Sequence, residues 1–188
     1  MDSIKDILDK KSIKPVGRME EFVTVVSTPS SENREPLKFT DLLLKDLGED
    51  EWVAERLIPM GLTVMSAQPA SYKTWLLLHI AISVASGRKM FNHIETTQSG
   101  VLIIDEENSE RLLQKRIKLL TNETDLPIYF MVENAFKADD KHINKVIKFC
   151  RKQGIRLITI DSLVRIHSGN ENDAVQMSEM FLKVRRFT

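Results

Sequence analysis

The sequence predicts an α/β fold with a mainly parallel sheet and helices on both of its faces. The alternation of two kinds of segment favours this class. From residue 51 onward, short aliphatic runs alternate with longer segments whose apolar residues recur at helical spacing. Such strand–helix–strand units build parallel sheets, because each crossover helix must pack back onto the sheet. Ligands of such sheets bind beyond the carboxyl ends of the strands, so functional residues are expected there.

The first strand–helix–strand unit is the clearest. The apolar run at 62–67 predicts a buried strand, and residues 73–86 predict a helix. This helix is apolar nearly all round, so it must be covered on most sides. Gly87 is expected to end it, because a glycine readily takes the left-handed conformation that terminates helices. A second buried strand is predicted at 100–105.

The alternation continues through the second half of the chain. Aliphatic runs at 128–132 and 155–161 predict two further strands. Three more helices are predicted from apolar residues at helical spacing and from residues that can cap a helix. These helices are expected to start at Ser109, at Asp139 or Asp140, and at Asp173, and Gly154 is expected to end the second.

The two ends of the chain differ from this core. Residues 1–48 are predicted to be an N-terminal arm and linker, with short helices near 4–8 and within 37–47, and residues 49–188 to be the core domain. A Pro-containing polar stretch at 28–36 reads as linker. The arm is interpreted as flexible, with docking onto a neighbouring subunit as the alternative. Residues 183–188 run toward what looks like another strand, so we expect the domain to be cut short at its C-terminal end.

Composition excludes several classes of protein. The 188 residues carry 27 Lys and Arg against 27 Asp and Glu, so no global charge draws the chain to nucleic acid. The single cysteine cannot form an intrachain disulfide or a cysteine zinc cluster. No apolar run reaches the ~18 residues of a membrane span, and the N-terminus lacks a secretory pattern. We therefore expect a cytoplasmic protein without a membrane partner.

A loop between the first strand and the first helix carries the main functional signal. Its spacing follows the phosphate-loop pattern G-x-x-x-x-G-K-[ST], ending in Lys73 and Thr74. In such loops backbone N–H groups and the helix N-terminus surround the phosphates. The lysine contacts the β- and γ-phosphates, and the hydroxyl is a ligand of Mg²⁺. The residues expected to hold the nucleotide are Ala67, Gln68, Pro69, Ala70, Ser71, Tyr72, Lys73, Thr74 and Trp75.

Both glycines of the pattern are absent. Ala67 and Tyr72 occupy their positions, and no glycine occurs between 61 and 87. A positive φ at a residue other than glycine destabilises the folded state by on the order of 1 kcal/mol. The loop is therefore expected to need support from its neighbours.

Acidic residues end two of the predicted strands. Asp161 closes a predicted strand that contains four aliphatic residues, which is the Walker B arrangement of an acid that orders Mg²⁺ beside the phosphate loop. The alternative is an aspartate that only starts a turn. Ser162 follows it, so a catalytic glutamate must come from elsewhere. Glu107 at the end of the strand 100–105 is the preferred general base, with Glu106 or Asp105 supporting it, although acids also favour a helix N-terminus without any catalytic role.

Taken together, these motifs resemble RecA-like P-loop ATPases of the RepA-like AAA type, relatives of hexameric replicative helicases. The resemblance covers roughly residues 50–188 and is specific in the combination of its motifs. The stretches that carry it are 52–63; 72–76 with 85–87; 101–108 with Arg116; and 161–167 with Glu171, Asn172 and Met177.

The resemblance implies ATP and Mg²⁺ binding, hydrolysis, and a ring of subunits acting on DNA, possibly single-stranded. Carried over, Lys73 and Thr74 hold phosphate and Mg²⁺, Glu107 activates water, and Asp161 orders the metal. Residues such as Arg165 and His167 in the loop after Asp161 could sense the γ-phosphate or contact a partner, or simply be solvated.

Two other functions fit the same sequence. One is a nucleotide-binding regulatory or assembly module that hydrolyses ATP weakly or not at all. The other is a P-loop kinase for a small acceptor, although the basic lid that such kinases carry late in the chain is not visible here.

Overall fold

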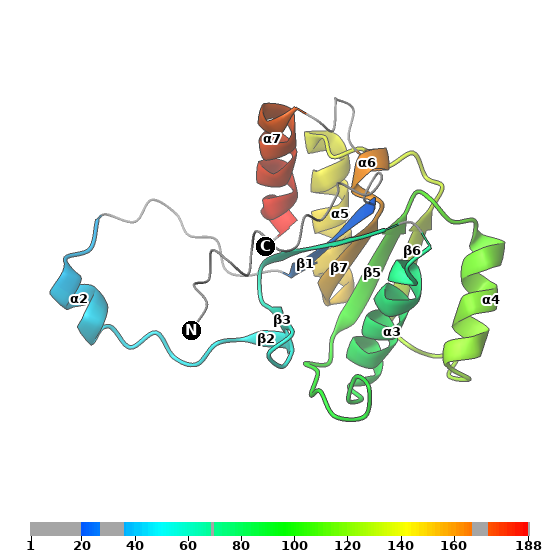
Figure 1. The fold of residues 1–188 in the computed structure, drawn as a ribbon, viewed down its shortest axis with the longest axis horizontal. Helices are drawn as coiled ribbons and strands as arrows, with labels where there is room; N and C mark the ends of the chain where they lie inside the picture. Colours follow the sequence, from blue (N-terminus) through cyan, green and yellow to red (C-terminus); the bar gives the residue numbers. More distant parts are fainter. Residues whose placement is uncertain (1–19, 27–35, 69, 167–172, 188) are drawn as a thin grey trace, which may run out of the picture.

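Among the residues that the structure describes, five strands form one sheet in the order β4–β1–β7–β5–β6 (Figure 1). The computed structural model describes residues 20–26, 36–68, 70–166 and 173–187. Four of the five strands point the same way, and only β1 runs antiparallel to its neighbours. The strands are β1 (Glu20–Val26), β4 (Leu62–Ala67), β5 (Gly100–Asp105), β6 (Ile128–Val132) and β7 (Ile155–Asp161), with a separate hairpin of β2 (Trp52–Ala54) and β3 (Ile58–Pro59).

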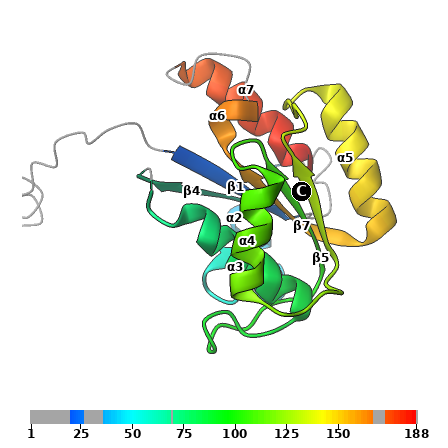
Figure 2. The same ribbon diagram turned by 90° about the vertical axis from the view of Figure 1, so that its right-hand side faces the viewer.

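Helices cover both faces of this sheet, with α3 on one side and α5 on the other (Figure 2). The predicted class, a RecA-like α/β P-loop fold with a mainly parallel sheet, is confirmed. The helical elements are α2 (Phe39–Leu44), α3 (Lys73–Ser86), α4 (Glu110–Leu120), α5 (Asp140–Gln153), α6 (Leu163–Ile166), α7 (Ala174–Val184) and the 3₁₀ turn η1 (Arg185–Phe187).

Two hydrophobic clusters hold the layers together, and β5 contributes to both because every one of its residues is buried. Val101 and Ile103 pack with α3 and α4, whereas Leu102 and Ile104 point to the opposite face and pack with α5 and α7. Successive side chains of a strand point to opposite faces, so an unbroken aliphatic run serves a strand covered on both sides.

The predicted element boundaries agree closely with the structure. The helix expected at 73–86 is α3, and Gly87 ends it at φ 70°. Asp139, rather than Asp140, caps α5 by accepting a hydrogen bond from the His142 backbone N–H. Asp173 caps α7 in the same way. Ser109 holds the N-cap position of α4, but its side chain makes no capping hydrogen bond in the described part of the chain.

Two expectations about the strands are wrong. The strand at 62–67 was expected to be buried, but β4 lies at the edge of the described sheet and its residues are half-buried or exposed. Residues 183–187 were expected to lead into a strand. Instead they complete α7 and form η1, in which Phe187 is buried against the cluster on the α5 side.

Strand β1 was not predicted from the sequence. It lies between β4 and β7, with Phe22 opposite Asp161 and Glu20 opposite Ala67. Residues before position 49 therefore contribute to the core sheet, although the division at 48/49 itself stays a prediction.

The helix predicted within 37–47 is α2, which lies well away from the sheet (Figure 1). The helix expected at 4–8 and most of the linker expected at 28–36 lie outside the described residues. None of the described helices combines the length and the apolar character needed to cross a membrane.

Candidate functional site

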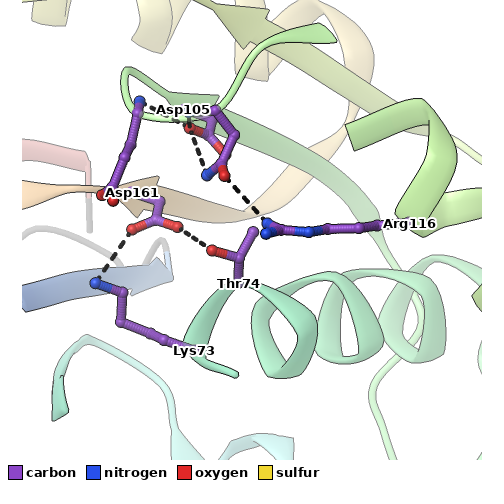
Figure 3. A network of polar contacts seen from close by, with 7 residues as sticks. Lys73, Thr74, Asp105, Arg116 and Asp161 are labelled. Atoms are coloured by element: carbon purple, nitrogen blue, oxygen red, sulfur yellow. Dashed lines mark hydrogen bonds and ion pairs between the residues drawn. The ribbon is translucent and has the colours of Figure 1, made fainter. Parts of the chain in front are cut away.

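The carboxyl ends of β5 and β7 bring two aspartates side by side. These strands are parallel, and Asp105 lies directly opposite Asp161 in their register. Both residues are completely buried. The β4–α3 loop approaches the same end of the sheet, so the predicted phosphate loop and both acidic strand ends meet there (Figure 3).

In the β4–α3 loop, residues other than glycine adopt the left-handed backbone conformation, which costs them free energy. Tyr72 precedes α3 in the left-handed region with φ 63°, and Ala70 has φ 62°. Tyr72 occupies the second glycine position of the phosphate-loop pattern, so this position takes a positive φ without a glycine. Ala67, at the first position, is the last residue of β4. Pro69 lies outside the described residues.

Strain at Tyr72 gives a testable stability difference. The tyrosine side chain is 77% exposed, so its removal loses little packing. We expect Tyr72→Gly to have a free energy of unfolding about 1 kcal/mol higher than Tyr72→Ala, less a part offset by the greater entropy of unfolded glycine. In a chain of this size 1 kcal/mol corresponds to about 2–4 °C in melting temperature, so the net difference is expected to be smaller than this. Thermal unfolding of both variants measures it, and a Tyr72→Gly variant that is less stable than Tyr72→Ala would contradict a strained loop.

Lys73 and Thr74 both reach Asp161. The Lys73 Nζ atom lies 3.5 Å from Oδ1 of Asp161, and the Thr74 hydroxyl donates a 2.9 Å hydrogen bond to Oδ2 (Figure 3). The Lys73 side chain is only 6% exposed. The first turn of α3 therefore places an ammonium and a hydroxyl directly against the strand-end carboxylate.

These groups fit a Mg²⁺ ion. Hard cations of this kind bind carboxylate and hydroxyl oxygens. Oδ1 of Asp161 is buried and accepts no hydrogen bond among the described residues, so its burial is compensated by the Lys73 ammonium at 3.5 Å and leaves the oxygen able to accept a further ligand. Thr74 and Asp161 are the residues that would hold the ion.

Asp105 organises the turn that follows β5. Its Oδ1 atom accepts hydrogen bonds from the backbone N–H groups of Glu107 at 2.9 Å and Asn108 at 2.7 Å. The Asn108 side-chain amide also donates to Oδ2 at 3.0 Å. Burial raises the pKa of Asp105 above its usual value, although the hydrogen bonds from Asn108 and Glu107 oppose this effect. Asp105 thus fixes the position of the Glu107 backbone.

Glu106 and Glu107 have different surroundings. The Glu106 carboxylate accepts a 2.8 Å hydrogen bond from the backbone N–H of Phe136, in the segment after β6. Glu107 instead lines a cavity of about 380 Å³ at the phosphate loop. This difference favours Glu107 over Glu106 as the residue that can reach a bound ligand.

The cavity brings most of the predicted site residues together. Neither Ala67 nor Asp161 is among its lining residues: Ala67 lies within β4, and Asp161 is fully buried and hydrogen-bonded to Thr74. The cavity is lined by Gln68, Ala70, Ser71, Tyr72, Lys73, Thr74, Trp75, Glu107, Asn108 and Arg116.

Asn108 and Arg116 had no assigned role before the structure was known. The Arg116 guanidinium donates a 3.1 Å hydrogen bond to Oδ1 of Asn108 (Figure 3) and lies 5.7 Å from the centre of the Trp75 ring. Arg116, Asn108 and Asp105 thus form a polar chain from the cavity to the turn that carries Glu107. The sequence signal for this hydrogen-bonded series is a basic residue, Arg116, in the helix that starts just after the strand-end acids.

Other residues named from the sequence lie elsewhere. Arg165 is exposed in α6 and does not line the cavity; its carbonyl accepts a hydrogen bond from Lys137. His167, Glu171 and Asn172 lie outside the described residues. Within the described ranges, no cluster of three or more His, Cys, Asp or Glu residues could hold a metal ion by itself.

These features define a P-loop nucleotide-binding protein. A phosphate loop joins a strand to a buried helix, and the lysine and hydroxyl at the start of this helix contact a carboxylate at the end of another strand. A family model described as an AAA domain matches residues 28–188. The chain therefore belongs to this AAA-type P-loop ATPase family, which confirms the resemblance to RecA-like ATPases. Nucleotide binding and ATPase activity characterise the family. No curated protein and no solved structure matches the chain.

Proposed function

We propose that this protein binds Mg·ATP in the cavity between the phosphate loop and α4 and hydrolyses it. One observation carries the proposal: Lys73, Thr74 and Glu107 line a single cavity, and Thr74 donates a hydrogen bond to Asp161. A phosphate chain there would meet the N-terminus of α3, whose N–H groups favour anions.

Each residue has a defined part in this proposal. Lys73 contacts the β- and γ-phosphate oxygens, which requires its ammonium to shift from Asp161 toward the ligand. Thr74 and Asp161 hold Mg²⁺. When bound, the ion neutralises charge on the β- and γ-phosphates.

Glu107 would act on the attacking water. Its backbone is fixed by Asp105, so its carboxylate can orient water and accept a proton as the γ-phosphate is transferred. Arg116 adds a second cation to the cavity wall, and its hydrogen bond to Asn108 ties it to the same turn. These interactions support phosphoryl transfer to water, with ADP and phosphate as products.

The finer part of the proposal concerns the biological task. We propose that hydrolysis is coupled to DNA replication or remodelling by a cytoplasmic ring of identical subunits, as in RepA-like helicases. The support is the combination of motifs shared with that type of ATPase. Single-stranded DNA is the polymer that such a ring would act on.

A specific observation favours the alternative of a regulatory module with weak hydrolysis. Two loop residues other than glycine take positive φ, and Lys73 and Thr74 are both engaged by Asp161. A strained loop with its cation already paired has less freedom to adjust to a triphosphate during turnover.

Steady-state phosphate release, measured with and without single-stranded DNA, tests the proposal. We expect Mg²⁺-dependent release that DNA stimulates and that Lys73→Ala abolishes. Release that is present but unaffected by DNA would contradict the DNA-coupled task. ATP binding without release would favour the regulatory module.

A further inference from the structure

Helix α5 concentrates positive charge in a chain that carries no net charge. The whole chain has 27 Lys and Arg residues against 27 Asp and Glu residues, whereas α5 has five Lys and Arg residues and a single acid. That acid, Asp140, forms an ion pair with Arg186 of η1. Since the chain as a whole cannot attract a polyanion, such a local patch is where one would bind.

Four of these basic residues form a single row along the helix. They stand at i, i+4, i+7 and i+11, which places them on one side of a helix with 3.6 residues per turn. At 1.5 Å of rise per residue the row is about 16 Å long. All four residues are exposed, because the opposite side of α5 packs into the core. The members of this lysine row are Lys141, Lys145, Lys148 and Lys152.

The lysine row has no acidic partners in the described part of the chain. None of its four ammonium groups forms an ion pair there, whereas other exposed cations do, such as Lys89 with Glu95. Like charges three or four residues apart on a helix repel one another, so the row opposes the stability of α5. A bound polyanion would remove this repulsion.

We propose that the lysine row binds the phosphate backbone of single-stranded DNA. A lysine ammonium contacts phosphate oxygens as a compact point charge, and a straight row of them can follow an extended charged backbone. Proteins that bind single strands combine such a basic track with aromatic side chains on which bases stack.

Phe149 supplies an aromatic side chain beside the row. It stands four residues after Lys145 and three before Lys152, so it is a neighbour of both on the helix surface. It remains 36% exposed, and its ring packs edge-to-face on Tyr129 with the ring centres 5.2 Å apart, which holds it in place. This neighbour favours a single strand over a duplex, whose bases are already stacked.

The burial of α5 favours nucleic acid over a lipid surface. A helix that binds a membrane interface inserts its apolar side chains among the lipids. The apolar side chains of α5, among them Ile143, Val146 and Cys150, are instead buried in the core. What α5 offers to a partner is therefore charge and one aromatic edge.

This inference deepens the proposed DNA-coupled task and rests on it for the identity of the polymer. The binding surface is nevertheless separate from the nucleotide site. No residue of α5 lines the nucleotide cavity, and α5 covers the opposite face of the sheet from α3 (Figure 2). DNA on the lysine row would therefore leave the cavity open to ATP.

Fluorescence anisotropy of a labelled oligothymidylate titrated with the full chain tests the inference. In the test variant all four residues of the lysine row are changed to glutamine, which has a similar helix propensity. In the matched control the same change is made at four exposed lysines outside α5, so the net charge falls equally. The control substitutions are Lys38→Gln, Lys45→Gln, Lys115→Gln and Lys118→Gln.

We expect the control to bind like the wild type and the test variant to bind at least about tenfold more weakly, with a reduced salt dependence. Each phosphate contact on a single strand contributes about −0.7 to the slope of log affinity against log salt, so losing four contacts makes the slope less steep by about 3. A milder variant, Lys145→Gln with Lys148→Gln, should change the slope by about half as much. Thermal unfolding checks that each variant is folded.

Several outcomes would overturn the inference. Equal affinity and slope in the wild type and in the milder variant would do so while leaving the DNA-coupled task standing. Absence of binding by the wild type would contradict both. Tighter binding of a duplex through the same lysines would contradict the role of Phe149. Binding of phosphatidylserine vesicles that requires the lysine row, without such a requirement for oligothymidylate, would assign the row to a membrane instead.

Discussion

Replacement of Glu107 by glutamine is expected to lower the rate constant of ATP hydrolysis by about 10²–10⁴-fold, the usual contribution of a general base. Nucleotide affinity should change little, because the amide keeps the size of the side chain and the lysine and hydroxyl of the loop are intact. Single-turnover phosphate release measures the rate, and equilibrium titration with ATP measures the affinity.

The neighbouring acid provides the control for this variant. Glu106 is hydrogen-bonded to the Phe136 backbone N–H rather than placed in the cavity. Glu106→Gln keeps an acceptor for this N–H and should therefore retain most of the hydrolysis rate. A larger loss in Glu106→Gln than in Glu107→Gln would exchange the two roles and contradict the assignment.

Lys73→Ala is expected to have the largest effect on stability. The Lys73 ammonium and the Asp161 carboxylate form an almost fully buried pair. Removing one partner of such a pair leaves an uncompensated buried charge and lowers the free energy of unfolding by about 3–5 kcal/mol. Denaturant unfolding without nucleotide measures this loss. ATP hydrolysis should also disappear, because the phosphate oxygens lose their cation.

Two further variants separate stability from function. The double variant Lys73→Ala, Asp161→Asn has no unpaired buried carboxylate. It should therefore regain part of the stability that Lys73→Ala loses, but none of the activity. Lys89→Ala breaks an exposed ion pair with Glu95 and should change neither property measurably. If the double variant were no more stable than Lys73→Ala, the loss would not come from the buried carboxylate.

Most of the core could be predicted because local signals and tertiary packing agree in it. The run Gly100–Asp105 is aliphatic without interruption, and β5 is buried on both faces. Gly87 and Gly154 end their helices in the left-handed conformation that glycine favours. Strand β1 is different, because its place between β4 and β7 depends on pairing with segments far away in the sequence.

In the candidate site, too, some residues could be predicted from local sequence signals and others depend on the folded geometry. Lys73, Thr74 and Glu107 could be placed because motif spacing fixes them relative to strand ends. The chain from Arg116 through Asn108 to Asp105 could not, because it depends on the geometry of the turn after β5. The sequence also could not show that Asp161 is buried and hydrogen-bonded to Thr74 without lining the cavity itself.

Calorimetric titration of Mg·ATP tests the central claim most directly, because it detects binding whether or not hydrolysis is fast. The wild-type chain is predicted to bind one nucleotide per subunit, with an affinity that falls sharply in Lys73→Ala and when Mg²⁺ is withheld. Absence of binding to the folded wild-type chain, or equal affinity in Lys73→Ala, would contradict the assignment of this cavity as the nucleotide site.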